Sequence, residues 1–377
     1  MGRLAWLHIA LGLSVGLALA GCPGGRIAEG GDGGGQEDGD AGADPGPPDG
    51  DDPGAPDGGA DAQDGADRQD GVDEGPARTL AERYPGDVGL ESDPAVIWFE
   101  GFEAGTVEAV RARYEDSKNP AGMSLVPDVP AGSGGAAAMR WTAHDGADAT
   151  DLYKRLPGAA EWYVRWYVKY QPGIHWHHSG VWVGGYNPPS DWPSPQAGLR
   201  PAGDDRFSIS LEPVYGVGGP APRLDFYNYW MGMHSWMAEP SGDTAYYGNA
   251  LVHRTGFTLD EGAWVCLELH VRLNPDPASG AGALLEVWKG DEPVARFDDA
   301  GPLGYWIRDK FCPEGADGPE CTDYPAPADT RLDLRLRSSL ALELNAFWPQ
   351  NYITDGPPGW LQFDHMVIAR ERIGCLR

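Results

Sequence analysis

The fold class of this 377-residue chain is set by one segment, Trp162-Tyr163-Val164-Arg165-Trp166-Tyr167-Val168-Lys169. Trp and Val occupy every second position, while Tyr, Arg and Lys fill the positions between them. Successive side chains of a strand point to opposite faces, so this alternation predicts a β-strand with one face on an apolar core. Aromatic and β-branched residues also favour strands.

The same alternation recurs in the segments 267–273, 340–345 and 361–368. Loops rich in Pro, Gly, Asn and Asp separate these segments, at 187–191, 216–222 and 274–282. The sequence offers one modest helix candidate, Val107 to Tyr114. Many strands, few helices and long loops predict an all-β domain, a two-sheet antiparallel β-sandwich or jelly roll over residues 79–377.

The N-terminal sequence has the pattern of an export signal. A basic start is followed by an uncharged run from Leu4 to Ala20, so residues 1–21 are predicted to be a signal peptide. The run is short and broken by glycines, which disfavours a spanning helix. Leu19-Ala20-Gly21-Cys22 resembles the lipobox of bacterial lipoproteins. We therefore expect lipidation at Cys22 and a place in the bacterial cell envelope outside the cytoplasm. The open alternative is an ordinary secreted protein.

Residues 22–78 are predicted to be a disordered linker. The stretch from Pro23 to Arg78 consists mainly of Gly, Asp, Pro and Ala, and its only branched apolar residues are Ile27 and Val72. Such a segment cannot bury enough apolar surface to offset its conformational entropy. It carries 16 acidic and 3 basic residues, so nearly half of the chain's net charge of −29 belongs to the linker.

This charge balance excludes nucleic acid as a partner, because phosphate binding needs clustered Lys and Arg. The membrane is expected as a partner only through the lipid anchor. No cofactor is predicted.

The chain has five cysteines. With Cys22 assigned to the anchor, four remain, and an even number in an exported protein favours disulfides. Cys312 and Cys321 flank a turn-rich loop and are predicted to pair with each other, which leaves Cys266 for Cys375. Zinc binding is the alternative, disfavoured because no C-x-x-C pair exists.

Some strands carry aromatic and polar residues on their second face. One row is Tyr163, Arg165, Tyr167 and Lys169, and another is Asp225, Tyr227 and Tyr229. Such a face suits a groove that receives a ligand. The alternative is a sheet face covered by loops.

Three regions resemble the alginate and glucuronan lyase-like group of polysaccharide lyases, which has a concanavalin A-like jelly roll. They are Trp162 to Tyr170 with His177-His178-Ser179-Gly180-Val181-Trp182-Val183-Gly184-Gly185, then Gly262 to Gly290, and finally Trp360 to Ala369. The resemblance implies a polysaccharide as partner, uronate-containing if the chain is an active lyase. In this chain His177 or His178 stands in the region of the family's Lys, and Ser210 where an Arg is expected. The paired tyrosines are Tyr227 and Tyr229.

A lyase removes the proton at C5 of a uronic acid and protonates the leaving oxygen, with the carboxylate neutralised. The catalytic candidates are His177, His178, Tyr227 and Tyr229. The candidates for substrate binding are Arg165, Tyr167, Lys169, Arg206, Asn228, His234 and Asn345. The glycine pair Gly184-Gly185 is expected to let the backbone approach a ligand closely.

Three other functions compete with the lyase. His175 and His177 would share a strand face and suit a metal, but spacing identifies no third ligand, so no metal site is predicted. A glycoside hydrolase is disfavoured because the sequence lacks an E-x-D-x-x-E pattern. A non-catalytic sugar-binding lipoprotein stays open, because Trp and Tyr faces stack on sugar rings. Whether the protein is an enzyme is thus left undecided by the sequence.

Overall fold

The computed structural model describes residues 78–143, 149–194, 197–214, 223–233, 237–238, 244–252, 257–298, 305–307, 310–312, 322–323, 333–353 and 357–377. The chain divides into two units, Met1–Gly71 and Val72–Arg377, and every described residue belongs to the second. The predicted signal peptide, Cys22 and the linker up to residue 77 lie outside the described residues. Within the described part, no helix is long and apolar enough to cross a membrane.

Helices are short. α1 (Leu80–Arg83) begins at a capping box formed by Thr79 and Glu82, in which each side chain binds the other residue's backbone N–H. α2 (Val107–Arg111) begins at Thr106, whose hydroxyl accepts the N–H of Ala109. The helix predicted from Val107 to Tyr114 is therefore present but ends earlier. The 3-10 turns are η1 (Pro85–Asp87), η2 (Leu90–Ser92) and η3 (Pro120–Gly122).

An eight-stranded antiparallel sheet forms one layer, with the order β14-β13-β12-β6-β19-β4-β3 and with β1 also paired to β19. Its strands are β1 (Val96–Glu100), β3 (Met123–Val126), β4 (Ala138–Thr142), β6 (Glu161–Tyr170), β12 (Val265–Arg272), β13 (Leu284–Lys289), β14 (Glu292–Phe297) and β19 (Trp360–Ala369).

A six-stranded antiparallel sheet forms the second layer, in the order β2-β5-β18-β7-β8-β9. Its strands are β2 (Asp116–Lys118), β5 (Thr150–Ala159), β7 (Ser179–Tyr186), β8 (Arg206–Val214), β9 (Arg223–Phe226) and β18 (Leu344–Asn351). A small two-stranded sheet consists of β10 (Met237–Ala238) and β11 (Thr244–Ala245). A small three-stranded sheet has the order β15 (Tyr305–Ile307), β16 (Lys310–Cys312) and β17 (Thr322–Asp323).

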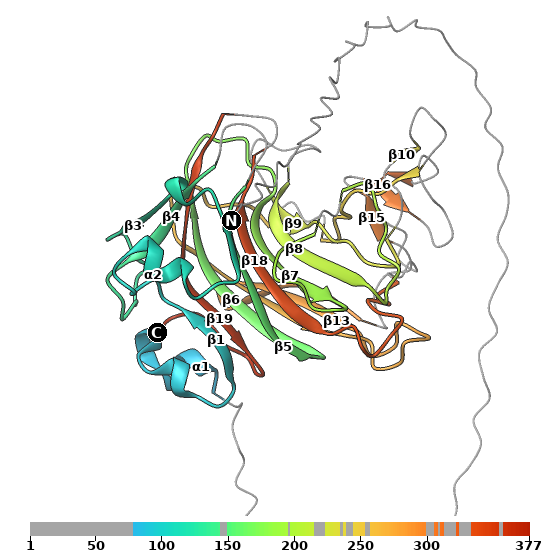
Figure 1. Ribbon diagram of the computed structural model, residues 1–377, viewed down its shortest axis with the longest axis horizontal. Helices are drawn as coiled ribbons and strands as arrows, with labels where there is room; N and C mark the ends of the chain where they lie inside the picture. Colours follow the sequence, from blue (N-terminus) through green and yellow to red (C-terminus); the bar gives the residue numbers. More distant parts are fainter. Residues whose placement is uncertain are drawn as a thin grey trace, which may run out of the picture. The chain divides into compact units, whose positions relative to one another are not determined.

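The main core lies between the two large sheets (Figure 1). Trp166 and Leu267 of the first sheet and Val183, Ile209 and Phe226 of the second are all buried in one apolar cluster. The predicted fold class, a two-sheet antiparallel β-sandwich, is confirmed. We call the face of each sheet opposite to the one that carries these five residues its outer face.

The predicted alternation fails in two places. Leu340 is 58% exposed in a turn closed by Leu342 N–H to Ser339 C=O, so β18 begins only at Leu344. The alternation of β19 breaks at a β-bulge, where the register shifts between Asp364 and Val367 and two consecutive side chains leave on the same face. A short apolar pattern cannot reveal a turn or an inserted residue, because the same residue types occur in turns, in bulges and in regular strands.

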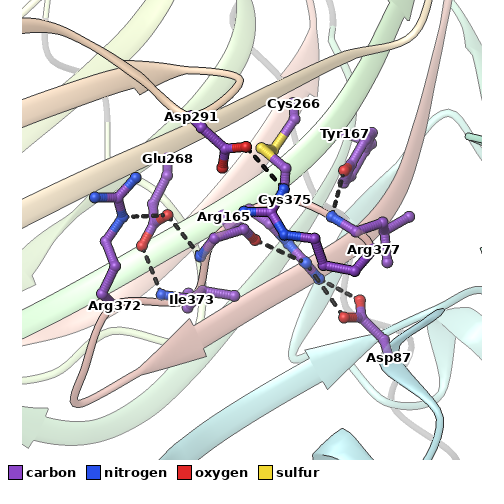
Figure 2. The surroundings of a disulfide bond; sticks show 12 residues. Asp87, Arg165, Tyr167, Cys266, Glu268, Asp291, Arg372, Ile373, Cys375 and Arg377 are labelled. Carbon is purple, nitrogen blue, oxygen red and sulfur yellow. Dashed lines mark hydrogen bonds and ion pairs between the residues drawn. A yellow bond between two sulfur atoms is a disulfide. The ribbon is translucent and has the colours of Figure 1, made fainter. Parts of the chain in front are cut away.

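The C-terminus is fastened to the outer face of the eight-stranded sheet (Figure 2). Buried Glu268 accepts bonds from Arg372 Nε and from the N–H groups of Ile373 and Gly374, at 2.8–2.9 Å. The predicted Cys266–Cys375 disulfide is confirmed, with the two Cα atoms 6.1 Å apart. The predicted Cys312–Cys321 pair lies outside the part of the chain whose side chains the structure describes.

Candidate functional site

Pairing in the six-stranded sheet aligns two rows of side chains on its outer face. Strand register places Trp348 opposite Trp182, and Trp182 opposite Ser210, while Tyr227 N–H donates to Ser210 C=O. Paired residues share a face, so aromatic rings flank a small side chain in this row. The neighbouring row is Ala346, Gly184, Ser208 and Tyr229.

The two tyrosines face the same way, as their spacing predicted. The Tyr229 hydroxyl donates to the Tyr227 hydroxyl at 3.4 Å. Tyr229 is 1% exposed, and burial raises the pKa of its phenol far above the usual value, so it stays a protonated donor. Tyr227 is half-buried and is the more accessible of the two. Trp182 lies against both rings, at centroid distances of 6.0 and 6.3 Å.

His178 joins this pair from the segment before β7. The His178 ring centroid lies 4.8 Å from that of Tyr227. The His177 ring stacks on the His178 ring, with the centroids 3.8 Å apart. The His178 backbone has φ 57°, a left-handed conformation that non-glycine residues seldom adopt. Such strained residues concentrate at functional sites.

Glu212 orients the His178 ring. Its Oε1 lies 3.1 Å from His178 Nδ1, and its Oε2 accepts the Ser210 hydroxyl at 2.8 Å. The Glu212 carboxyl is fully buried. When Nδ1–H donates to this carboxylate, Nε2 becomes the proton acceptor of the imidazole. The arrangement therefore combines an oriented base, His178, with a phenol, Tyr227, that can give up a proton.

Three residues predicted to bind substrate lie on the other large sheet, away from the tyrosines. Arg165, Tyr167 and Lys169 occupy the outer face of the eight-stranded sheet, because Trp166 and its alternating neighbours fill the core. Arg165 is fully buried and paired with Asp87. The Tyr167 hydroxyl accepts the N–H of Leu376, and Lys169 binds Asp128 at 2.8 Å. Terminal segments cover this face, as the loop-covered alternative expected.

The other candidates have varied positions. Arg206 shares the tyrosines' face but pairs with Asp205 at 2.6 Å, opposite Tyr186 in the register. Asn228 Oδ1 accepts the Ser210 N–H, and buried Asn345 bonds the Tyr186 backbone twice. These two amides thus support the sheet. His234 lies outside the described residues.

The structure gives the glycine pair Gly184-Gly185 a role inside the sheet. A Cβ on Gly184 would lie 2.2 Å from the Phe207 carbonyl oxygen, and one on Gly185 would lie 1.9 Å from that of Glu343. Both positions need glycine because neighbouring backbone approaches them closely. The predicted approach of a ligand at this pair stays a prediction.

Glu212 is the functional residue that the sequence interpretation missed. The available signal was the alternation of Ser208, Ser210 and Glu212, which puts a carboxyl on the same face as the tyrosines. Its contact with His178 depends on the left-handed turn at that histidine, which spacing does not reveal.

No family model and no curated protein matches this chain. Among solved structures, it is similar to the marine PL-14 alginate lyase from Aplysia kurodai, at 13% identity and a TM-score of 0.44, over 72% of this chain and 98% of that one. It is also similar to alginate lyase Aly36B, at 10% identity and a TM-score of 0.42, over 75% and 96%. An endo-β-1,4-glucuronan lyase from Trichoderma reesei matches at 10% identity and a TM-score of 0.34, over 66% and 87%. These similarities carry no part of the functional argument, which rests on the side chains of the outer face.

Proposed function

We propose that this protein binds a uronate-containing polysaccharide on the outer face of the six-stranded sheet and cleaves it by β-elimination. The observation that carries the proposal is the convergence of His178, Tyr227 and Tyr229, with Glu212 fixing the histidine. Half-buried Trp348, whose ring packs 5.4 Å from that of buried Trp182, adds apolar surface on which a sugar ring can stack.

In the proposed reaction, His178 Nε2 takes the proton from C5 of the uronic acid. Electrons of the C5–H bond form the C4–C5 double bond, and the bond from C4 to the glycosidic oxygen breaks. Tyr227 donates its proton to the leaving oxygen, and the Tyr229 hydroxyl then stabilises the Tyr227 phenolate through their hydrogen bond. We assign His177, which stacks on His178, to the uronate carboxylate, because its imidazole N–H can donate a hydrogen bond to it.

The test is incubation of the mature protein with uronate polymers while the absorbance of the unsaturated product is followed. Tyr227→Phe should lower turnover at least about a hundredfold, because it removes the proton donor. Tyr229→Phe removes one supporting hydrogen bond, worth about 1 kcal/mol, and should lower turnover roughly fivefold. Tyr163→Phe is the matched control, since Tyr163 lies on the eight-stranded sheet and keeps its stacking on His270.

The second candidate function is sugar binding without catalysis, which the aromatic rows also favour. In that case the wild-type protein would retain the polymer in affinity electrophoresis and form no unsaturated product. Tyr227→Phe would then weaken binding by only about 1 kcal/mol. If no uronate polymer is retained and none yields unsaturated product, both functions are contradicted.

We further propose that the β domain acts at the bacterial cell envelope, held by a lipid on Cys22 through the acidic linker. The lipobox-like sequence before Cys22 supports this, as does the composition of residues 22–78. A linker of this length would let the domain search for polymer around its anchor.

A further inference from the structure

A second cluster of reactive side chains lies on the outer face of the eight-stranded sheet. Ser133 Oγ lies 2.6 Å from His365 Nε2, and His365 Nδ1 lies 2.7 Å from Asp87 Oδ2. Three residues far apart in sequence thus form a hydroxyl–imidazole–carboxylate chain. The proposed lyase site uses none of them.

The backbone is shaped to bring these residues together. Gly134 N–H donates to Gly86 C=O at 3.0 Å, which docks the Ser133 loop on the turn that carries Asp87. A Cβ at Gly134 would lie 2.8 Å from the Gly86 carbonyl oxygen, so glycine at this position permits the close approach of the two backbones. The β-bulge in β19 directs His365 toward the same place.

Backbone strain marks the same residues. Asp87 has φ 62° and His365 has φ 46°, both in the left-handed region. Among the described residues, only five non-glycine residues have positive φ, and two of them belong to this cluster. Backbone strain at two residues whose side chains also contact each other indicates that the strained conformations serve a function.

Charge and burial suit a catalytic base. Asp87 and His365 are each 3% exposed. Burial alone would raise the pKa of the Asp87 carboxyl, but the Arg165 guanidinium and the hydrogen bond from His365 hold that pKa below its usual value. An ionised Asp87 fixes the proton of His365 on Nδ1, which leaves Nε2 to accept the hydroxyl proton of Ser133. Ser133 itself is only half-buried and is flanked by Gly132 and Gly134.

We propose that Ser133, His365 and Asp87 form a second catalytic site, a serine-hydrolase triad that cleaves carboxylic esters. Ser133 Oγ attacks the ester carbonyl carbon while its proton passes to His365 Nε2. The carbon–oxygen bond to the alcohol then breaks, and His365 returns the proton to the departing oxygen, which leaves an acyl group on Ser133. Water, deprotonated by His365, releases the acid and restores the serine.

A hydrogen bond within the loop positions the serine, and a cavity lies beside the histidine. Gly135 N–H donates to Ser133 Oγ at 2.9 Å, which holds the hydroxyl oxygen in place while its proton points to His365. A cavity of about 440 Å³ lies next to the cluster: Phe99, which lines it, has its ring centroid 6.2 Å from that of His365. Glu103 also lines it and accepts the N–H groups of Ala136 and Ala137 in the Ser133 loop. Trp98 and Phe99 contribute to the wall of that cavity, so its apolar part suits a small acyl group.

The test uses the mature full-length chain with a fluorophosphonate, which labels activated serines, and with p-nitrophenyl acetate. Peptide mass mapping should place a single phosphonyl adduct on Ser133. Ester hydrolysis by Ser133→Ala should fall at least about a hundredfold below wild type. Ser124→Ala, an exposed serine on β3, should hydrolyse the ester at the wild-type rate.

Two results would overturn the proposal. One is the absence of a phosphonyl adduct at Ser133 of the wild-type protein, a measurement that does not depend on the folding of any variant. The other is equal ester hydrolysis by wild type and Ser133→Ala, with equal melting temperatures. Either outcome would reduce the cluster to a buried polar network that fastens residues 85–88 to the sheet.

Discussion

Asp364 lies next to His365 in the bulge of β19, and burial raises the pKa of its carboxyl to about 8. An unfolded Asp has a pKa of about 3.9. Between these values the folded protein therefore binds a proton that the unfolded chain releases, so this group makes stability fall as pH rises from about 4 to 8. The loss should be on the order of a few kcal/mol.

Asp364→Asn should remove this dependence. Its amide oxygen can still accept the His365 N–H, as Asp364 Oδ1 does at 2.7 Å, and it does not titrate. Urea unfolding at about pH 5 and about pH 8 should show the variant gaining stability relative to wild type at the higher pH. Glu108→Gln, an exposed carboxyl on α2, is the control. Parallel pH curves for wild type and Asp364→Asn would contradict the assignment.

Individual residues could be predicted where spacing alone decides their direction. Tyr227 and Tyr229 are two apart, and they do share a face. Arg165 was assigned to a ligand face because it alternates with core residues, and alternation cannot say what covers that face. Asp87, which pairs with Arg165, lies 78 residues earlier in the chain. Glu212 was missed because its meeting with His178 depends on one left-handed dihedral angle.

At the scale of elements, the disulfide joins β12 to the C-terminal segment across a sequence separation of 109 residues. Closing so long a loop restricts the unfolded chain and should stabilise the fold by about 2–5 kcal/mol. Cys266→Ala with Cys375→Ala should lower the free energy of unfolding by that amount in denaturant titration. The hydrogen bonds from residues 372–374 to Glu268 should keep the variant folded. An unchanged free energy would mean that the hydrogen bonds alone hold the segment.

Elements were predicted well where both faces have a clear role. β6 and β12 match their predicted segments because apolar residues at every second position fill the core. β19 also formed, but its bulge and its edge contact with β1 could not be predicted, since both depend on a partner distant in sequence. The start of β18 was placed too early because leucines in a turn resemble leucines in a strand.

For the whole molecule, the linker and the β domain should be thermodynamically independent. Residues 26–75 have too few apolar side chains to add to a core. Their deletion should change the melting temperature of the β domain by less than about 2 °C in calorimetry. Deleting residues 371–377 is the contrasting control, because it removes the disulfide and the Glu268 contacts and should lower the melting temperature markedly. A large drop on linker deletion would show that part of the linker packs on the domain.

The place of the whole molecule in the cell should depend on one thiol. Cys22→Ser keeps the apolar run from Leu4 to Ala20 and removes the sulfur that would carry the lipid. An acyl anchor contributes about 0.8 kcal/mol for each buried CH₂ group, so its loss should shift the protein from the membrane fraction to the soluble exported fraction. Cell fractionation with metabolic labelling by a fatty acid measures both effects. Gly30→Ser in the linker should stay membrane-bound and labelled. If Cys22→Ser partitions with membranes as strongly as wild type, the protein is held there by something other than this lipid.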